Sequence, residues 1–224
     1  MKFDKNSYTG ESFSKELITM GELSRIKFSN CLFRWTDFTD VEVLYGCTFE
    51  SCDFTNARLN GVNIKNCNFL SCKFENTSFF ATTLDDCKMT GSDFMDADCA
   101  MLQIVGGDWS YTNLRKQSFQ KQDLSNIRFS SADLSECHFN QCKMNNCEFD
   151  EAIVHETSFY KSDLRHSSID RLDILNASFR QAKLDIEQCI IIAEYVTEGR
   201  YTPDCSKQDD SKTIQKCNPQ STKS

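Results

Sequence analysis

The sequence contains no uninterrupted stretch of about 18 apolar residues, which is the length that a membrane-spanning helix requires. Its first ten residues include Lys2, Asp4 and Lys5, and they lack the apolar segment of a secretory signal. We therefore expect a soluble, cytoplasmic protein that makes no contact with a membrane.

The chain also lacks an excess of basic over acidic residues. The chain holds 33 acidic and 25 basic residues, which gives a net charge of −8. Nucleic-acid-binding domains carry basic patches that neutralise phosphates, so this balance argues against direct binding of nucleic acid. It is compatible with a basic protein partner.

Residues that carry catalysis are scarce. Of the three histidines, His138, His155 and His166, none has a cysteine or serine nucleophile arranged beside it in the sequence pattern. The Gly106-Gly107 pair is not followed by a helical pattern, so it does not form a phosphate-binding loop. We expect a protein that is not an enzyme and that has no catalytic residue, metal site or cofactor.

The apolar residues follow neither the helical period of 3.6 nor the strand period of 2. They follow a step of five, and every fifth residue from Phe49 to Leu184 is apolar. From Tyr8 to Val43 the same step continues one residue out of phase. A single extra residue near 44–46 accounts for the slip, and Gly46 is able to adopt an unusual backbone angle there.

A small residue usually stands two positions before each apolar residue of the series. Nine of the 13 cysteines occupy this position, among them Cys47, Cys67 and Cys87. The spacing is therefore that of the repeat and not of a zinc site, which needs closer pairs of cysteines. Cys205 and Cys217 lie outside the repeat, and we expect them to be the more reactive thiols.

Strings such as Ala132–Glu136 and Ser162–His166 resemble the pentapeptide-repeat family, whose motif is a small residue, Asp or Asn, Leu or Phe, and two polar residues. This resemblance implies a right-handed quadrilateral parallel β-helix, with one pentapeptide on each side and 20 residues in each coil. The physics agrees, because a five-residue unit buries its one large side chain only when neighbouring units stack above and below it. At steps of 20, the columns that contain Phe49 and Phe79 place large rings on two opposed sides.

The pattern predicts three regions. Residues 1–184 form the β-helix, 185–199 form a short capping helix that begins after Asp185, and 200–224 form a disordered polar tail. In the helix, Ile186, Cys189, Ile190 and Ala193 share one face, which suits contact with the last coil. A second apolar group remains for local packing or for a homodimer interface, and it consists of Ile191, Ile192, Tyr195 and Val196.

Outward charges are unevenly distributed over the four sides. The side that runs from Phe54 to Ile174 has a net charge of −5, because only Lys73, Arg115 and Lys116 oppose eight acidic residues. The next side is basic, with Arg58, Lys121, Lys161 and Arg180. We expect partner binding through the acidic side, which carries Asp53, Glu75, Asp93, Asp96, Asp133, Glu136, Glu156 and Asp173.

The segments Tyr8–Glu11 and Ser168–Ile174 resemble the quinolone-resistance (Qnr) members of the family. That resemblance implies a dimeric mimic of DNA that binds DNA gyrase and topoisomerase IV, both type II topoisomerases, and gives quinolone resistance. Many Qnr proteins interrupt the repeat with two loops, whereas 49–184 has no insertion.

The charge of the whole rod does not match that of DNA. Residues 48–185 carry about one net charge per 6 Å of rod, against one per about 1.7 Å in duplex DNA. Only a mimic that uses one side of the rod fits these numbers. The alternative is an interaction scaffold or effector module that has no connection with topoisomerases.

Overall fold

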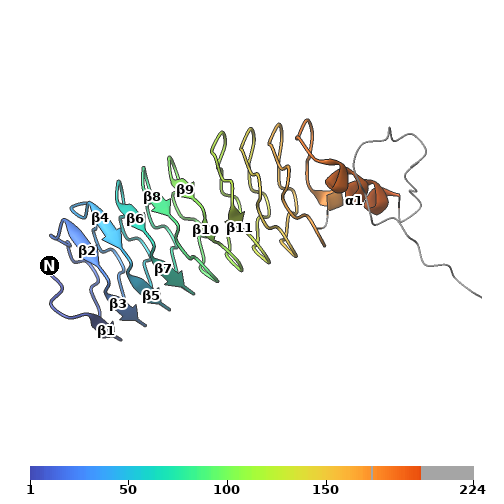
Figure 1. The fold of residues 1–224 in the computed structure, drawn as a ribbon. Helices are drawn as coiled ribbons and strands as arrows, with labels where there is room; N and C mark the ends of the chain where they lie inside the picture. The colour runs from blue at the N-terminus through green and yellow to red at the C-terminus, as the bar shows by residue number, and fades with distance from the viewer. Residues whose placement is uncertain (173, 198–224) are drawn as a thin grey trace, which may run out of the picture.

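The computed structural model describes residues 1–172 and 174–197. The chain winds into a right-handed parallel β-helix with four sides, and a short helix closes its C-terminal end (Figure 1). Each side of each coil holds one pentapeptide, with its central apolar residue buried and the residues before and after it facing outward. We number the sides 1 to 4 in the order in which the chain visits them from Tyr8 onward.

Side 1 carries one row of parallel strands and side 4 carries another. The strands of side 1 are β1 (Ser7–Thr9), β3 (Lys27–Ser29), β5 (Thr48–Glu50), β7 (Asn68–Leu70), β10 (Gly107–Asp108) and β11 (Ile127–Arg128). Those of side 4 are β2 (Glu22–Ser24), β4 (Val43–Tyr45), β6 (Asn63–Lys65), β8 (Thr83–Asp85) and β9 (Gln103–Val105). Sides 2 and 3 are joined by single parallel bridges such as Asp53↔Lys73 and Arg58↔Ser78.

Most corners are tight turns with a positive φ two residues after the central apolar residue. Asn56 has φ 61° there, and Ala57 donates its N–H to the carbonyl of Phe54 at 2.8 Å. Such turns favour glycine and asparagine at that place, yet Trp35, Tyr111 and many other residues adopt the same conformation here. Gly46, with φ 61°, is therefore an ordinary corner and does not mark the register slip.

The extra residue lies earlier than the sequence suggested. Residue Leu17 pairs with Asp37, twenty positions on, whereas Glu22 pairs with Val43, which is 21 positions on. Both Glu42 and Val43 donate their backbone N–H groups to the carbonyl of Gly21, at 2.8 and 3.1 Å. Two residues opposite one form a β-bulge, so the slip is at 42–43 and Leu44, not Val43, points into the core.

The small residues two positions before each central apolar residue leave space in the core, and several of them also donate hydrogen bonds. Thr77, Thr82 and Thr157 donate their hydroxyls at 2.6–2.7 Å to the carbonyl of the central residue one coil earlier. The thiols of Cys137 and Cys142 do the same at 2.8 and 2.7 Å. These carbonyls lie inside the rod, where an unpaired acceptor is costly, so a small donor stabilises the corner better than alanine does.

Gly107 stands two residues before Trp109, so its small size was expected to make room for the indole in the core. A Cβ at Gly107 would lie 2.2 Å from the carbonyl oxygen of Cys87, and its φ is +100°. The glycine therefore makes room for the backbone of the preceding coil, and not for the indole of Trp109. That indole is fully buried, and its Nε1 has no hydrogen-bond partner among the described residues.

Helix α1 (Ile186–Val196) follows the last coil, after a short 3-10 turn η1 (Ile174–Asn176). Asp185 accepts the N–H of Gln188, and the Gln188 side chain accepts the N–H of Asp185, which forms a capping box. The Gln188 amide also donates to the carbonyls of Leu164 and Ser167, at 2.6 and 2.8 Å. It thereby satisfies the acceptors at the open end of the coil, as a further repeat would.

Candidate interaction surfaces

The coil is filled by side chains along its length, so a partner meets the outward residues. Described residues contain no group of three or more His, Cys, Asp and Glu side chains that is able to hold a metal ion. The three histidines lie on separate sides: His138 on side 3, His155 on side 2 and His166 on side 4. Within the described ranges, no helix is both long enough and apolar enough to cross a membrane.

The acidic residues expected to bind a partner lie on side 2, but their charges are not equally available. Glu75, Asp96 and Glu156 are exposed, and Asp93 accepts the side-chain amide of Asn113 at 2.8 Å. Asp173 lies outside the described residues.

Asp53 was expected to face the solvent, but only 9% of it is exposed. Its carboxylate pairs with the Arg34 guanidinium at 2.6 Å. Burial opposes its ionisation, but the hydrogen bonds from Arg34 and Thr55 outweigh burial and hold the pKa of Asp53 below its usual value. Asp53 therefore offers no free charge to a partner.

Arg115 reduces the charge farther along side 2. Its guanidinium lies 3.7 Å from the carboxylate of Asp133 and 3.5 Å from that of Glu136. On side 3, Arg58 likewise pairs with Asp37 at 2.5 Å. Counting the charges in each column of the sequence did not reveal pairs such as Arg34–Asp53 and Arg58–Asp37. The extra residue at 42–43 lies between the partners, so they are not 20 positions apart.

The densest negative charge crosses the edge between sides 1 and 2 in the C-terminal half. Three arginines pair with carboxylates of this region: Arg115 as described above, Arg128 with Glu148 at 2.6 Å, and Arg171 with Glu151. Asp170 is exposed. We name this region the C-terminal acidic surface, and its members are Asp133, Glu136, Glu148, Asp150, Glu151, Glu156 and Asp170.

Three members of the C-terminal acidic surface, Asp133, Glu136 and Glu156, belong to the side expected from the sequence. The other four lie on side 1, so a count of the charges on side 2 alone does not include them. Their signal was present in the run Glu148-Phe149-Asp150-Glu151, where every outward residue is acidic. Summing the outward charges of two neighbouring sides in the sequence would have revealed this surface.

The cysteines of the repeat are buried free thiols, among them Cys47, Cys67 and Cys87. Burial raises the pKa of Cys87 and of Cys137 to about 12. A protonated thiol is a hydrogen-bond donor and a weak nucleophile, which agrees with a structural role. Cys189 on α1 is exposed, and Cys205 and Cys217 lie outside the described residues.

The helix presents a different face to the coil from the one expected. Ile191 and Ile192, which were expected to remain for a partner, are partly buried against the core. Ile186 is 69% exposed and Cys189 is exposed, although both were expected to pack on the last coil. The reason is polar: the two hydrogen bonds of the Gln188 amide set the rotation of the helix, which hydrophobic periodicity alone does not reveal.

The exposed apolar side chains of the helix region are therefore Ile186, Tyr195 and Val196, with Leu175 on η1. Tyr195 and Val196 are 43% and 60% exposed, and both belong to the group expected at a dimer interface.

The family model for pentapeptide repeats matches residues 43–79 and 123–159, in 8 copies. No curated protein matches the sequence. Full-length QnrB1, a plasmid-mediated fluoroquinolone resistance protein, superposes with a TM-score of 0.70 at 24% identity, over 85% of this chain and 99% of its own. A trypsin-treated variant of QnrB1 gives 0.74 at 24% identity, over 85% and 95%. The repeats, the four-sided coil and these matches show that the chain contains pentapeptide repeats and that its fold is similar to that of QnrB1.

Proposed function

We propose that this protein is a non-catalytic DNA mimic that binds a type II topoisomerase, DNA gyrase or topoisomerase IV, and modulates it. In this proposal it binds no nucleic acid itself, and protection of the enzyme from quinolones would follow from binding. The fold supports the proposal because it is that of a fluoroquinolone resistance protein. The observation that carries it is the C-terminal acidic surface.

The charge density of this surface is close to what mimicry needs. Its seven carboxylates and the three arginines that pair with them leave a net charge of −4 over three coils. At the spacing between parallel strands, three coils span about 14 Å, so one net charge falls about every 3.5 Å. Duplex DNA carries one per about 1.7 Å. The charge density of the whole rod is far below that of DNA, whereas two neighbouring sides of its C-terminal half come within about a factor of two.

Such a surface would meet a basic DNA-binding groove by charge complementarity. Complementary charge mainly raises the rate of association, and added salt screens it. We expect binding that weakens steeply between low and physiological salt. The remaining acidic residues of side 2, Glu75, Asp93 and Asp96, would extend the contact toward the middle of the rod.

The test measures gyrase supercoiling and binding with and without the protein, and again with a fluoroquinolone. One variant replaces four carboxylates of the surface, as Asp150→Asn, Glu151→Gln, Glu156→Gln and Asp170→Asn, and should weaken binding at least tenfold. The matched control removes the same charge from exposed positions near the N-terminus, as Glu16→Gln, Glu22→Gln, Asp40→Asn and Glu42→Gln. Equal loss in both variants, or no binding by the wild type at low salt, would contradict the proposal.

The second candidate is an interaction scaffold without a topoisomerase partner. The uninterrupted repeat from 49 to 184 favours it, because many Qnr proteins carry two loops there. A pull-down that returns unrelated proteins and no topoisomerase, together with unchanged supercoiling, would support the scaffold.

We further propose a homodimer through the C-terminal helix. Ile191 and Ile192 pack inside the protomer, so the interface would consist of Tyr195 and Val196, joined by Ile186. Ile186→Ser with Val196→Ser should convert the dimer to a monomer in sedimentation equilibrium at tens of micromolar. Ile153→Ser, an equally exposed apolar residue on side 2, is the control. A monomeric wild type at that concentration would exclude the dimer.

A further inference from the structure

Neighbouring coils are joined on each side by three backbone hydrogen bonds in a fixed pattern. On side 3, for example, Ser78 donates to the carbonyl of Ala57, Leu59 donates to Ser78 and Gly61 donates to Phe80, at 2.9–3.0 Å. The same three bonds recur between the coils of Phe139 and Phe159, where His138 and Ser158 form a bridge. These ladders leave no room for another strand.

Between 97–106 and 116–126 this pattern stops on two sides. Within the described chain, Cys99 and Met101 on side 3 donate no backbone hydrogen bond to Ser118 and Gln120. On side 4, β9 is the last strand of its five-stranded sheet, and among the described residues no bridge joins it to the coil that follows. Figure 1 shows the separation after β9. Sides 1 and 2 remain joined through β10 and β11 and through the Asn113↔Asp133 bridge.

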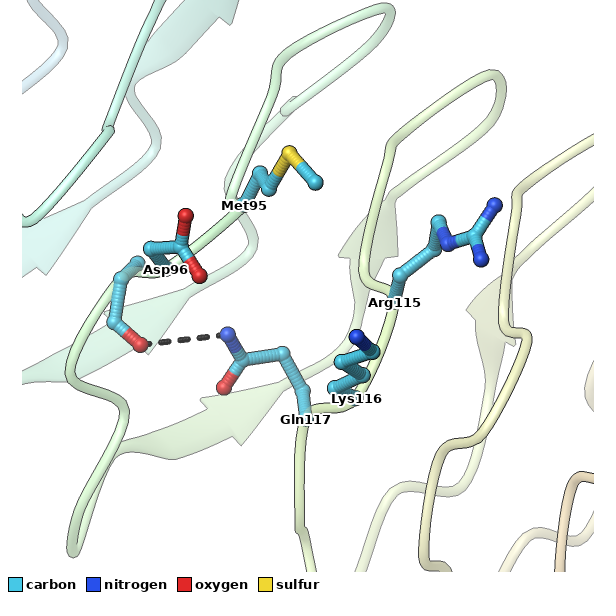
Figure 2. A pocket seen from close by; sticks show the side chains of 6 residues that line it. Met95, Asp96, Arg115, Lys116 and Gln117 are labelled. Atoms are coloured by element: carbon cyan, nitrogen blue, oxygen red, sulfur yellow. Dashed lines mark hydrogen bonds between the residues drawn. The ribbon is translucent and has the colours of Figure 1, made fainter.

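A long side chain at a position for a small one explains the opening. Gln117 stands two residues before Phe119, where the other repeats of side 3 from Thr36 to Ala177 have Thr, Ala or Cys. Its amide donates to the carbonyls of Phe94 and Ala97, both at 3.1 Å, and takes the place of the backbone bond that Ser118 would make to Ala97. Figure 2 marks one of these two bonds with a dashed line. Gln122 holds the same long side chain on side 4. The hydrogen bonds of Gln117 therefore account for the opening on side 3, and Gln122 stands at the equivalent position on side 4.

A pocket of about 310 Å³ opens at one end of this gap. Met95 and Asp96 line it from the earlier coil, and Arg115 and Lys116 line it from the later one (Figure 2). The pocket is an entrance at the corner between sides 2 and 3, from which the unpaired edges run along sides 3 and 4.

The two coils that border the gap carry different kinds of side chain. The earlier coil carries large exposed apolar side chains beside its unpaired edge: Met95 is 46% exposed, Met101 68% and Val105 53%. The later coil carries Arg115, Lys116 and Lys121, all exposed. Exposed apolar residues gathered along an unpaired strand edge are typical of a surface that accepts another strand.

We propose that this gap is a binding site for an extended peptide segment of a partner protein, which adds to β9 as a strand. Its backbone would pair with the free N–H groups of Cys99, Met101 and Ile104. Its apolar side chains would contact Met101 and Val105, and acidic side chains would face Lys116 and Lys121. The site adjoins the C-terminal acidic surface at Arg115, but the variants that test the two proposals change different residues, so either proposal is able to fail alone.

Replacing the glutamines should close the gap. Serine stands at the equivalent inward position in intact repeats, where Ser162 and Ser167 donate to the carbonyls of Phe139 and Met144. The closure variant is therefore Gln117→Ser with Gln122→Ser. Its control is Gln120→Ser with Gln141→Ser, because both of these glutamines are outward and exposed.

The first measurement is amide hydrogen exchange. The amides of Cys99, Met101 and Ile104 should exchange at least a hundredfold faster than those of Leu59 and Phe79 in the wild type and the control. In the closure variant they should be protected, at an unchanged melting temperature or a higher one. Protection of these amides in the wild type would mean that the ladder is closed in solution, and it would overturn the proposal.

The second measurement uses a phage-displayed library of random linear peptides, selected on the full chain. Recovered peptides should alternate apolar and acidic residues, bind the wild type and the control alike, and bind the closure variant at least tenfold more weakly. Bound peptide should slow exchange at Cys99 and Met101. If no peptide distinguishes the closure variant, the proposal is wrong and the gap is only a flexible joint in the rod.

Discussion

The halves of the rod on either side of this gap are packed differently. In the N-terminal half, aromatic rings stack on the neighbouring sides 1 and 2, as in the pairs Phe49–Phe69 and Phe33–Phe54, with centroids 4.7 and 4.8 Å apart. In the C-terminal half they stack on the opposed sides 1 and 3, as in Phe129–Phe149 and Phe139–Phe159, both at 5.5 Å. The sequence predicted opposed columns of rings throughout, which holds only for the C-terminal half.

The change of sides coincides with the missing hydrogen bonds. Phe94 is followed on side 2 by Leu114, and Cys99 is followed on side 3 by Phe119. A coil stacks closely on its neighbour when side chains of like size lie above one another, because protein interiors tolerate neither voids nor overlap. In this rod the ladder is missing at the place where one packing pattern meets the other, which is also where Gln117 and Gln122 stand.

The largest effect should come from a charge placed in the core of one half. Phe139→Asp buries an unpaired carboxylate and should cost several kcal/mol. Because only sides 1 and 2 connect the halves, we expect the C-terminal half to unfold while amides from Phe28 to Phe74 remain protected from hydrogen exchange. Phe139→Leu, which keeps an apolar centre, is the control. An unchanged melting temperature for Phe139→Asp would contradict the assigned register.

A smaller effect is expected at the connection between the halves. Gly107→Ala places a Cβ against the backbone of Cys87 and should cost about 2 kcal/mol or more, because backbone cannot move aside as a flexible side chain does. Gly106→Ala also has a positive φ but meets nothing within 4 Å, so it should cost about 1 kcal/mol. Urea denaturation of the two variants measures the difference. Equal losses would show that the contact with Cys87 relaxes.

The smallest effect is a loss of stability at low pH, and it is confined to the C-terminal end of the rod. Burial opposes ionisation of Asp185, but the N–H groups of Gln188 and His166 outweigh it and hold the pKa of Asp185 below its usual 3.8. The stabilisation is therefore complete above the usual pKa and is lost as pH falls through the lowered value.

Helix α1 should accordingly lose its protection from hydrogen exchange below about pH 4, before the N-terminal half does. Asp185→Asn retains a capping acceptor that does not titrate, and it should remove this pH dependence at a cost near 1 kcal/mol or less. The same acid transition in Asp185→Asn would assign the transition to another carboxylate.

The five-residue step was sufficient to predict the coil, because each repeat solves the same local problem of burying one large side chain. It predicted the buried centres from Phe49 onward and the structural role of the cysteines. It misplaced the extra residue, since a bulge at Glu42–Val43 and a slip at Leu44 give the same apolar spacing on either side. For the candidate site, it found part of the acidic surface but not the residues on side 1.

By itself, the sequence determined the four-sided coil, the identity of its central residues and the outward direction of its charges, because these follow from a periodicity that every repeat shares. Only the tertiary structure decided which charges pair across coils, how Gln188 turns the helix, and where the ladder opens at Gln117. These features depend on contacts between residues about 20 positions apart. The size of one side chain or a single hydrogen bond determines each of them, and neither changes the five-residue period of the sequence.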